Sequence, residues 1–497
     1  MELFTLVIGV LVTILSYLLI QAIYNFYFHP LAHIPGPWWV ACSLVVKFHD
    51  KYGPLVRISP SDLHFNDPYF YEKVYCGPSQ KRNKHKDRVR LVSAPSSLFS
   101  TVDQKLHRTR RSYLSGFFSK QAVARLEPFM HSKTTQLASR FKQMQQTGQS
   151  IDAYVTYGAL TSDVISYYAY GESFDCISSP DFSNDFMRAL SSLQFVSLTS
   201  YFFPWILDCM HRLPPRLVQL INPTIKSVFD LHDLVISYAV KSVNTPKRND
   251  MKNESIFEAL ADPSIAEHER TVARLADEGL VVLGAGLETT ARTLTVITYH
   301  LIANPDILAK MRTDPALPRE NLPYLNAVIN ERLRTDAFIM QKGERVLIEP
   351  LMYNNILIPK GTIIGASSWL LNKNPEIFPE PHRFRPERWV EAQERGENLA
   401  KYLTTFSKGT RICLGINMAY AELYIAIVSL FRQFDLELAP GCSIEDIACD
   451  RDYGVGFTKN YKWGIRFRVA KVLDDQGKCM FGWMQGGVSI IQSYMIS

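Results

Sequence analysis

The 497-residue sequence has no paired cysteines, no concentrated basic tract and no internal repeat. Its eight cysteines include no C-x-x-C pair, a pattern typical of a reducing compartment, so we expect no disulfide bonds. The net charge is only +6, and the basic residues are scattered along the chain. This distribution argues against nucleic acid as a partner.

The composition is that of a folded globular protein, because 47% of the residues are hydrophobic and 21% are charged. No long low-complexity linker divides it, so we expect one main domain over residues 51–470, mainly α with small β-sheets. Helical periodicity covers residues 103–118, 121–146, 160–170, 184–199, 223–243, 267–303, 322–333 and 416–434. Strand patterns cover residues 55–65, with a break at Pro60, and residues 343–358 and 361–366.

The first segment is apolar and carries no charge from Leu3 to Tyr24, a run long enough to cross a bilayer as a helix. A cleaved signal peptide is the alternative, but the apolar run is too long and Glu2 stands where basic residues would be. Residues 1–28 are therefore predicted to be a transmembrane anchor, followed by a proline-rich hinge and lead-in over residues 29–50. The first basic residue after the helix is Lys47, so charge does not give the topology.

One cysteine stands in a distinctive loop. Phe406, Gly409, Arg411, Cys413 and Gly415 fit the pattern F-x-x-G-x-R-x-C-x-G in all five fixed positions, a match expected by chance about once in ten thousand chains of this length. The loop resembles the haem-binding loop of the cytochrome P450 family. Any other cysteine here is best interpreted as a small buried hydrophobe.

The chemistry of haem ligation accounts for each residue type in this loop. Cys413 precedes a predicted helix, whose free N–H groups and dipole favour a thiolate, and a thiolate ligand favours O–O cleavage at iron. Gly409 and Gly415 allow close backbone approach to sulfur and porphyrin, and Phe406 is expected beside the ligand. Arg411 offers a charge-assisted donor to a haem propionate. The implied cofactor is haem b with Cys413 as the axial ligand.

The resemblance extends along the chain to a motif that is expected to be structural. Glu331 and Arg334 match the family's E-x-x-R, and the segment 384–389 supplies Arg388, which usually completes a buried charge triad with them. Taken alone, Glu331 and Arg334 could be an ordinary helix-surface ion pair. In the family the triad holds the segment that carries the cysteine loop.

A second chemical motif lies inside the predicted helix over residues 267–303. Ala285, Gly286, Glu288 and Thr289 match the family's A-G-x-D/E-T-T motif. Taken alone, such a patch usually means close helix packing. In the family it is the distal wall of the haem site, where Ala285 and Gly286 leave room for dioxygen. The Thr289 hydroxyl can bond a carbonyl one turn back, and Glu288 and Thr289 would deliver protons.

A basic helix segment supplies further expected haem contacts. His107 and Arg111 are one turn apart and can both face propionates. Lys105, Arg108 and Arg110 would then point elsewhere, either as a solvated face or, as the resemblance implies, as a docking site for an acidic reductase surface.

Three places depart from the family pattern. The stretch between Pro37 and Lys51 is short, so the first helix of the body is expected to be missing. Lys342 stands where a propionate-binding Arg is usual, with Glu344 in place of Pro, which keeps the charge but not bidentate geometry. Residues 471–497 have no family counterpart and form an atypical tail.

The resemblance implies a haem-thiolate monooxygenase, most similar to membrane-bound fungal enzymes of secondary metabolism near the trichodiene-oxygenase-like group. The expected partners are NADPH-cytochrome P450 reductase, cytochrome b5, the membrane and an apolar small molecule such as a terpenoid, polyketide or alkaloid-like metabolite. The expected location is the endoplasmic reticulum membrane, crossed once, with a cytosolic catalytic domain. The alternatives are a redox-neutral haem-thiolate isomerase or dehydratase, which needs no proton relay, and an inactive relative. Residues 93–97, 195–203 and Ile339 are expected over the haem and form an apolar pocket that does not specify the substrate.

Overall fold

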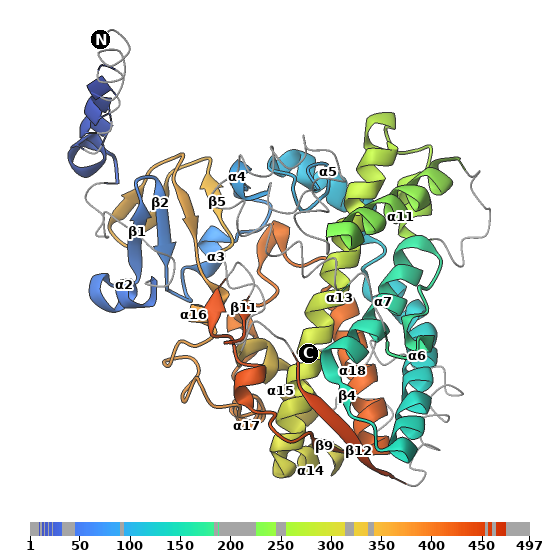
Figure 1. Cartoon of the computed structure of the whole chain (residues 1–497). Helices are drawn as coiled ribbons and strands as arrows, with labels where there is room; N and C mark the ends of the chain where they lie inside the picture. Colours follow the sequence, from blue (N-terminus) through green and yellow to red (C-terminus); the bar gives the residue numbers. More distant parts are fainter. Residues whose placement is uncertain are drawn as a thin grey trace.

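A computed structural model shows a mainly helical protein with four small sheets among the described residues (Figure 1). It describes parts of residues 9–31, Met187, and residues 45–89, 94–182, 225–244, 255–313, 323–335, 342–452, 456–459 and 464–473. The predicted fold class is confirmed.

Most helices lie where hydrophobic periodicity places them. The α-helices are α2 Val45–Tyr52, α3 Tyr71–Val74, α4 Lys86–Val89, α5 Gln104–Ser115, α6 Lys120–Thr147, α7 Ala153–Tyr170, α11 Ile225–Asn244, α12 Ile256–Leu260, α13 Val272–Ala303, α14 Pro305–Thr313, α15 Pro323–Thr335, α16 Ser368–Leu371, α17 Glu387–Glu394 and α18 Ile416–Gln433. Shorter turns are η1 Tyr24–Phe28, η4 Cys176–Ser178, η6 Glu267–Glu269, η7 Leu399–Tyr402, η8 Gly409–Arg411 and η9 Ile444–Asp446. Apart from Met187, the helix expected over residues 184–199 lies outside the described residues.

The strands are short, as predicted. They are β1 Leu55–Ser59, β2 Asp62–Phe65, β3 Arg82–Asn83, β4 Ile151–Asp152, β5 Arg345–Leu347, β6 Leu351–Tyr353, β7 Ile356–Ile358, β8 Ile363–Gly365, β9 Phe434–Leu438, β10 Arg451–Asp452, β11 Gly456–Phe457 and β12 Arg466–Val472. The largest sheet has the order β1-β2-β8-β5-β3, and a second sheet has the order β4-β12-β9. The break at Pro60 separates β1 from β2, which pair antiparallel.

Side chains at the helix ends fix where several helices begin. Asp103 accepts a hydrogen bond from the Leu106 N–H at the start of α5, and Thr271 does the same for the Arg274 N–H at the start of α13. These caps satisfy N–H groups that have no partner within the helix. The helix α6 ends at Gly148, whose φ of 64° is a left-handed conformation that glycine adopts without strain.

The helix α13 runs through the middle of the body and organises its core (Figure 1). It packs against α7, α11 and α18, and buried apolar residues fill the space between these helices. A separate cluster of buried residues, which includes Leu63, Phe65 and Ile364, stabilises the largest sheet. The sheet with β1 and β2 therefore lies beside a helical body that is built around one long helix.

The structure changes one expectation about the lead-in to the body. A helix, α2, precedes β1, so the expectation that the first helix is missing is wrong. Phe48 and His49 are the buried residues of this eight-residue helix. The His49 Nε2 atom lies 2.7 Å from the His64 Nδ1 atom of β2. The helix α2 can be this short because the buried contact between His49 and His64 holds it against β2.

Among the described residues, one helical stretch is long and apolar enough to span a membrane, and it is Glu267–Ala303. Its most apolar window is 67% buried, so it is a core helix of the body. Helical residues at the N-terminus stand apart from the body in Figure 1, with exposed apolar side chains such as Leu15 and Ile20. The sheet strand β12 ends at Val472, and residues 474–497 of the predicted tail lie outside the described residues.

Candidate active site

The cysteine loop is held in place by one backbone hydrogen bond within it and by another to Cys76. The Cys413 N–H donates to the Phe406 carbonyl at 2.9 Å, and the Thr410 N–H donates to the Cys76 carbonyl at 3.1 Å. Gly409 has a φ of 72°, and a Cβ atom there would lie 2.2 Å from the Cys76 carbonyl oxygen. No other residue fits at this approach. A Cβ at Gly415 would meet nothing within 4 Å, so open space lies on that side of the loop.

The Cys413 thiol can be reached by solvent although the surrounding protein encloses it. Burial raises its pKa, while the Gly415 N–H and the positive charge of Arg111 act in the opposite direction. Arg111 is fixed nearby, because its Nη1 atom donates to the Ile412 carbonyl at 2.9 Å. Burial of the thiol thus opposes the stabilisation of the thiolate that was expected from the helix end. A bound metal cation deprotonates a coordinating thiol.

Five basic side chains gather beside this loop, and we call them the basic cluster: Lys84, His107, Arg111, Arg345 and Arg411. Burial and the charges of Arg411, Lys84, Arg111 and Arg345 lower the pKa of His107 to about 3. Burial, together with Arg345 and Arg411, holds the pKa of Lys84 well below its ordinary value. Such mutual repulsion in a buried place is costly unless an anionic group binds there.

Arg411 is oriented within the cluster by two carbonyl groups. Its Nη1 and Nη2 atoms donate to the Thr101 and Val102 carbonyls at 2.8 and 2.7 Å. Its buried Nε atom has no hydrogen-bond partner among the described residues. Burial and the charge of Arg345 lower the pKa of Arg411 to about 9, although the nearby Asp103 raises it. A buried guanidinium with a donor to spare suits a carboxylate such as a haem propionate.

The sequence did not indicate that Lys84 and Arg345 belong to this cluster, and it placed Lys342 in their role. Lys342 instead forms an ion pair with Asp62 and lies 3.7 Å from Glu344. Its role as a propionate ligand remains a prediction that these contacts do not favour. Arg345 follows three residues later and contributes the positive charge that acts on His107 and Arg411.

The middle of α13 carries the motif that was expected to form the distal wall of the site. The Thr289 hydroxyl donates to the Ala285 carbonyl at 2.8 Å, as the sequence predicted. Ala285 is exposed, whereas Leu287 and Glu288 of the same helix segment are buried. Gly286 has a different role from the expected one, because a Cβ there would lie 2.8 Å from the Ile165 side chain of α7. Its lack of a side chain serves the close packing of α7 and α13.

Glu288 projects toward α7. The Tyr154 hydroxyl donates to the Glu288 Oε1 atom at 3.1 Å, and the Glu288 side chain is buried. Burial and the charge of Glu288 hold the pKa of Tyr154 well above its ordinary value. Glu288 and Thr289 are neighbours in sequence, but Glu288 accepts a hydrogen bond from Tyr154 whereas Thr289 donates one to Ala285, on different faces of α13.

Comparison with known proteins decides the family. A sequence profile described as cytochrome P450 matches residues 38–463. The chain is a cytochrome P450. Conidiogenone synthase PchP450 of Penicillium rubens is 36% identical over 475 residues, which cover 90% of this chain and 96% of that protein. Cytochrome P450 monooxygenase TRI4 of Fusarium sporotrichioides is 36% identical over 453 residues, which cover 85% of this chain and 87% of that protein.

Further comparisons agree on the fold and the reaction class. N-acetyltryptophan 6-hydroxylase ivoC of Emericella nidulans is 34% identical, covering 89% of this chain and 93% of that protein. Retinoic acid bound cyanobacterial CYP120A1 superimposes with a TM-score of 0.69 at 19% identity, over 88% of this chain and 99% of that chain, and supports the fold. The chain is a haem-thiolate monooxygenase similar to fungal enzymes of secondary metabolism.

The cofactor of this cytochrome P450 is haem, with iron bound by an axial cysteine thiolate. The described residues fit it: an accessible thiol at Cys413, a basic cluster with a spare buried donor on Arg411, and open space beside Gly415. Among the residues expected over the haem, positions 94–97 are described, whereas residue 93, residues 195–203 and Ile339 lie outside the described residues.

The buried charge triad lies behind the cysteine loop. The Glu331 Oε1 atom lies 2.7 Å from the Arg334 Nη2 atom and 3.2 Å from the Arg388 Nε atom. The Trp389 Nε1–H also donates to Glu331, at 2.9 Å. Arg334 in turn donates to the Asn372 carbonyl at 3.1 Å. The fully buried Glu331 carboxylate thus joins α15 to α17, and Arg334 joins α15 to Asn372.

Glu331→Ala is expected to prevent stable folding of the haem-loaded enzyme. It would leave two buried guanidinium groups without their carboxylate, a loss of about 3–5 kcal/mol when one member of a buried pair is removed. The measurement is the yield of soluble, haem-containing protein and its urea unfolding. Glu394→Ala, at an exposed position of α17, is the matched control. A normal yield and unfolding curve for Glu331→Ala would show that the triad is not needed for folding.

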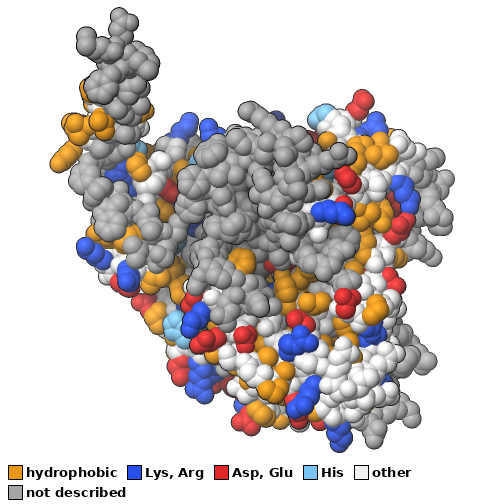
Figure 2. Space-filling view, in the orientation of Figure 1, with side chains coloured by type: hydrophobic (Ala, Val, Ile, Leu, Met, Phe, Trp, Pro, Cys, Tyr) orange, Lys and Arg blue, Asp and Glu red, His pale blue; other side chains and the backbone are white. Residues whose placement is uncertain are grey.

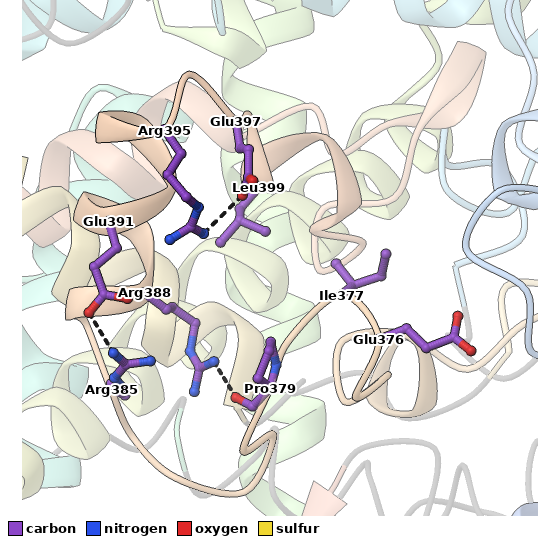
Figure 3. Close-up of a pocket in the computed structure, with 9 residues that line it drawn as sticks. All are labelled: Glu376, Ile377, Pro379, Arg385, Arg388, Glu391, Arg395, Glu397 and Leu399. Carbon is purple, nitrogen blue, oxygen red and sulfur yellow. Dashed lines mark hydrogen bonds and ion pairs between the residues drawn. The ribbon is translucent and has the colours of Figure 1, made fainter.

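A pocket of about 250 Å³ lies on the outer side of Arg388, and Figure 3 shows the side chains that line it. Arg385 lies 2.5 Å from Glu391, and Arg395 lies 2.9 Å from Glu397. Three arginines and three glutamates line this pocket, so it has no excess charge of one sign. This composition does not favour a haem site, in contrast to the basic cluster.

A second buried carboxylate lies on α18, the helix that follows Cys413. Burial raises the pKa of Glu422 to about 8, although a hydrogen bond from Thr290 of α13 lowers it. The folded protein therefore holds this proton more tightly than the unfolded chain, whose ordinary pKa for glutamate is 4.5. The free energy of unfolding falls as the pH rises from 4.5 to about 8, and this contribution is constant above that range.

Glu422→Gln is expected to stabilise the protein increasingly as the pH rises, because glutamine is neutral at every pH. The gain should grow by on the order of 1 kcal/mol per pH unit between pH 5 and pH 8 and level off above. Urea unfolding at several pH values measures it, with Glu394→Gln as the exposed control. Parallel stability curves for Glu422→Gln and the wild type would contradict the prediction.

Proposed function

We propose that this cytochrome P450 is a membrane-anchored enzyme that oxidises an apolar small molecule of fungal secondary metabolism with electrons from NADPH-cytochrome P450 reductase. The observation that carries the proposal is the accessible Cys413 thiol with the basic cluster beside its loop. We propose a terpenoid, polyketide or alkaloid-like substrate, and the support is the similarity to enzymes that include a conidiogenone synthase and an N-acetyltryptophan hydroxylase.

Each part of the site has a separate task in this proposal. Cys413 binds the iron, and His107, Arg111 and Arg411 hold the propionates together with Lys84 and Arg345. When bound, haem supplies the iron at which dioxygen is reduced and one oxygen atom is transferred to the substrate. Phe406 and Gly415 shape the backbone around the sulfur.

Thr289 and Glu288 act on protons in this proposal. The Thr289 hydrogen is engaged with the Ala285 carbonyl, so its oxygen is left as an acceptor that can hold a proton-bearing water. Glu288 accepts from Tyr154, so it must turn from α7 toward the site to pass a proton. Thr289 therefore positions the proton donor, and Glu288 connects the site to the protein interior.

The proposed electron donors approach from the side of α5. Lys105 and Arg108 of this helix are exposed and suit an acidic surface of the reductase or of cytochrome b5. Arg110 does not belong to this docking surface, because it is held by Glu269 at 2.9 Å. Elsewhere, acidic and basic side chains are interspersed on the described part of the face in Figure 2, which does not favour a nucleic-acid surface.

The experiment that tests the proposal is reconstitution of the enzyme with NADPH-cytochrome P450 reductase and extracts of candidate apolar metabolites under isotopically labelled dioxygen. The expected product carries one labelled oxygen atom and forms only with NADPH. Product that forms without NADPH, or without label, would contradict a monooxygenase reaction.

We also propose that residues 1–28 anchor the enzyme in the endoplasmic reticulum membrane, with the catalytic domain in the cytosol. The support is the uncharged run from Leu3 to Tyr24.

Deletion of residues 1–28 is expected to move the protein from the membrane pellet to the alkaline carbonate supernatant, because the main apolar anchor is lost. The full-length protein is the control. A truncated protein that resists extraction as the full-length protein does would contradict the anchor.

A further inference from the structure

The helix α2 is docked on the largest sheet through a pair of histidines. It lies beside β1 and β2 (Figure 1), where the rings of His49 and His64 have their centroids 4.9 Å apart. The His49 Nε2 atom is 2.7 Å from the His64 Nδ1 atom, and the two side chains are buried. The two rings thus meet inside the protein, where a change of charge is costly.

The outer hydrogen bonds of the pair determine which nitrogen carries each proton. The Ser367 backbone N–H can only donate, and it donates to the His64 Nε2 atom at 3.1 Å. The Gly53 carbonyl can only accept, and it lies 2.9 Å from the His49 Nδ1 atom. The His64 Nε2 atom is therefore bare, and the His49 Nδ1 atom is protonated. When both rings are neutral, the His64 Nδ1–H donates to the His49 Nε2 atom, and all three contacts are satisfied.

This arrangement has no place for a further proton. A proton on the His49 Nε2 atom would face the His64 Nδ1–H across 2.7 Å. A proton on the His64 Nε2 atom would face the Ser367 N–H across 3.1 Å. In both cases a hydrogen bond is replaced by a contact between two donors. The docked pair is satisfied only while both rings are neutral, and histidine is the side chain that gains its proton closest to neutral pH.

The charged groups on the sheet side of the pair also disfavour protonation. Burial, the neighbouring His49 and the positive charge of Lys342 hold the pKa of His64 well below its ordinary value. Lys342 is itself paired with Asp62 of β2 and lies 3.7 Å from Glu344. The two carboxylates are thus engaged with this lysine, and the charge that acts on His64 is positive.

The helix side is similar for His49. Burial lowers its pKa, although the Gly53 carbonyl and the charge of Asp50 act in the opposite direction. On β1, which packs against α2, the charged side chain is Arg57, and its guanidinium donates to the Pro60 carbonyl at 2.9 Å. A histidine whose pKa is lowered on folding stabilises the folded form above its ordinary pKa of 6.5 and loses that contribution as the pH falls below it.

We infer that His49 and His64 form an acid-sensitive latch, which docks α2 on the sheet in neutral solution and releases it in mildly acidic solution. Since α2 precedes the first strand of the body, the latch sets how firmly the lead-in is held to the sheet. The inference is a conformational device of the fold, and it does not depend on the reaction that the enzyme catalyses.

The first test is amide hydrogen exchange of the full-length, haem-loaded enzyme at pH 7.5 and 5.5, in peptides that span α2 and with correction for the intrinsic effect of pH. The open form can bind protons that the docked form excludes, so a lower pH favours opening. Protection of α2 is expected to fall by about tenfold or more between the two pH values.

His49→Gln is the variant that assigns this fall to the latch. Glutamine offers an acceptor to His64 and a donor to the Gly53 carbonyl, but it does not titrate. The fall in protection of α2 should be several-fold smaller than in the wild type. His268→Gln, at an exposed position of η6, is the matched control and should keep the wild-type fall. Equal falls in the wild type and in His49→Gln would overturn the latch.

A second measurement uses the wild type and decides if His49→Gln does not fold. Hydrogen exchange at the ring carbon between the two nitrogens, followed by mass spectrometry across pH, reports the protonation of each histidine. His49 and His64 are expected to titrate below 6.5, so that both rings are neutral in the docked form. Rings that titrate at 6.5 or higher would overturn the inference, because the docked pair would then accept the proton that the latch must exclude.

Discussion

Cys413→Ser is expected to abolish the CO absorption band at about 450 nm and all reductase-dependent product formation. A serine hydroxyl stays protonated where a metal-bound thiol ionises, so the iron loses the electron-donating ligand that favours O–O cleavage. The loss should be complete, since no other described cysteine lies in this loop.

Cys442→Ser is the matched control for this substitution. Cys442 is a half-buried cysteine whose sulfur lies 3.4 Å from the Arg466 carbonyl oxygen, away from the cysteine loop. It should keep the 450 nm band. Retention of that band in Cys413→Ser would show that another residue ligates the iron.

Thr289→Ala is expected to lower the amount of product formed per NADPH consumed by several-fold. The reason is that the hydroxyl oxygen that can hold a proton-bearing water is lost. Alanine favours the helix, so haem binding and substrate affinity should survive. The measurement is the ratio of product and of hydrogen peroxide to NADPH consumed, and the expected change is less product with more peroxide.

Thr295→Ala provides the control on the same helix. Thr295 also donates to a carbonyl one turn back, that of Ala291 at 2.9 Å, but it is buried away from Ala285. Loss of the Thr295 hydroxyl should leave the ratio of product to NADPH consumed unchanged. Unaltered coupling in Thr289→Ala would mean that Glu288, Thr290 or a hydroxyl of the substrate holds the proton donor.

The long helices could be predicted because their periodicity is strong, and α18 agrees with the sequence to within one residue. The start of α7 could not be predicted in the same way. It was expected at Leu160, but the helix begins at Ala153, where the Asp152 side chain accepts from the Val155 N–H. Nearly every side of α7 is buried, so there is no polar stripe from which the period can be read.

The cysteine loop was readable because its chemistry lies within ten consecutive residues. The basic cluster was only partly predictable from the sequence, because its five members come from four separate segments. Lys84 lies in a run of basic residues that normally indicates a solvated surface, and it became a buried member only through its contacts with other parts of the fold. Arg110 is a similar case. It was expected to lie on a solvated or docking face, but it pairs with Glu269, which is far away in sequence.

Gly286 shows a third limit of sequence reasoning. The motif implied space over the cofactor, whereas the structure places the Ile165 side chain of α7 against this glycine. Only the packing of two distant helices distinguishes these interpretations.

The most direct test of the central claim, that Cys413 ligates a haem which activates dioxygen, is the reduced CO-difference spectrum of the purified wild-type enzyme together with its haem content. The result expected is one haem per chain and a band at about 450 nm, the signature of thiolate ligation. Haem-containing protein whose CO band lies at a shorter wavelength, as for a neutral ligand, would contradict it.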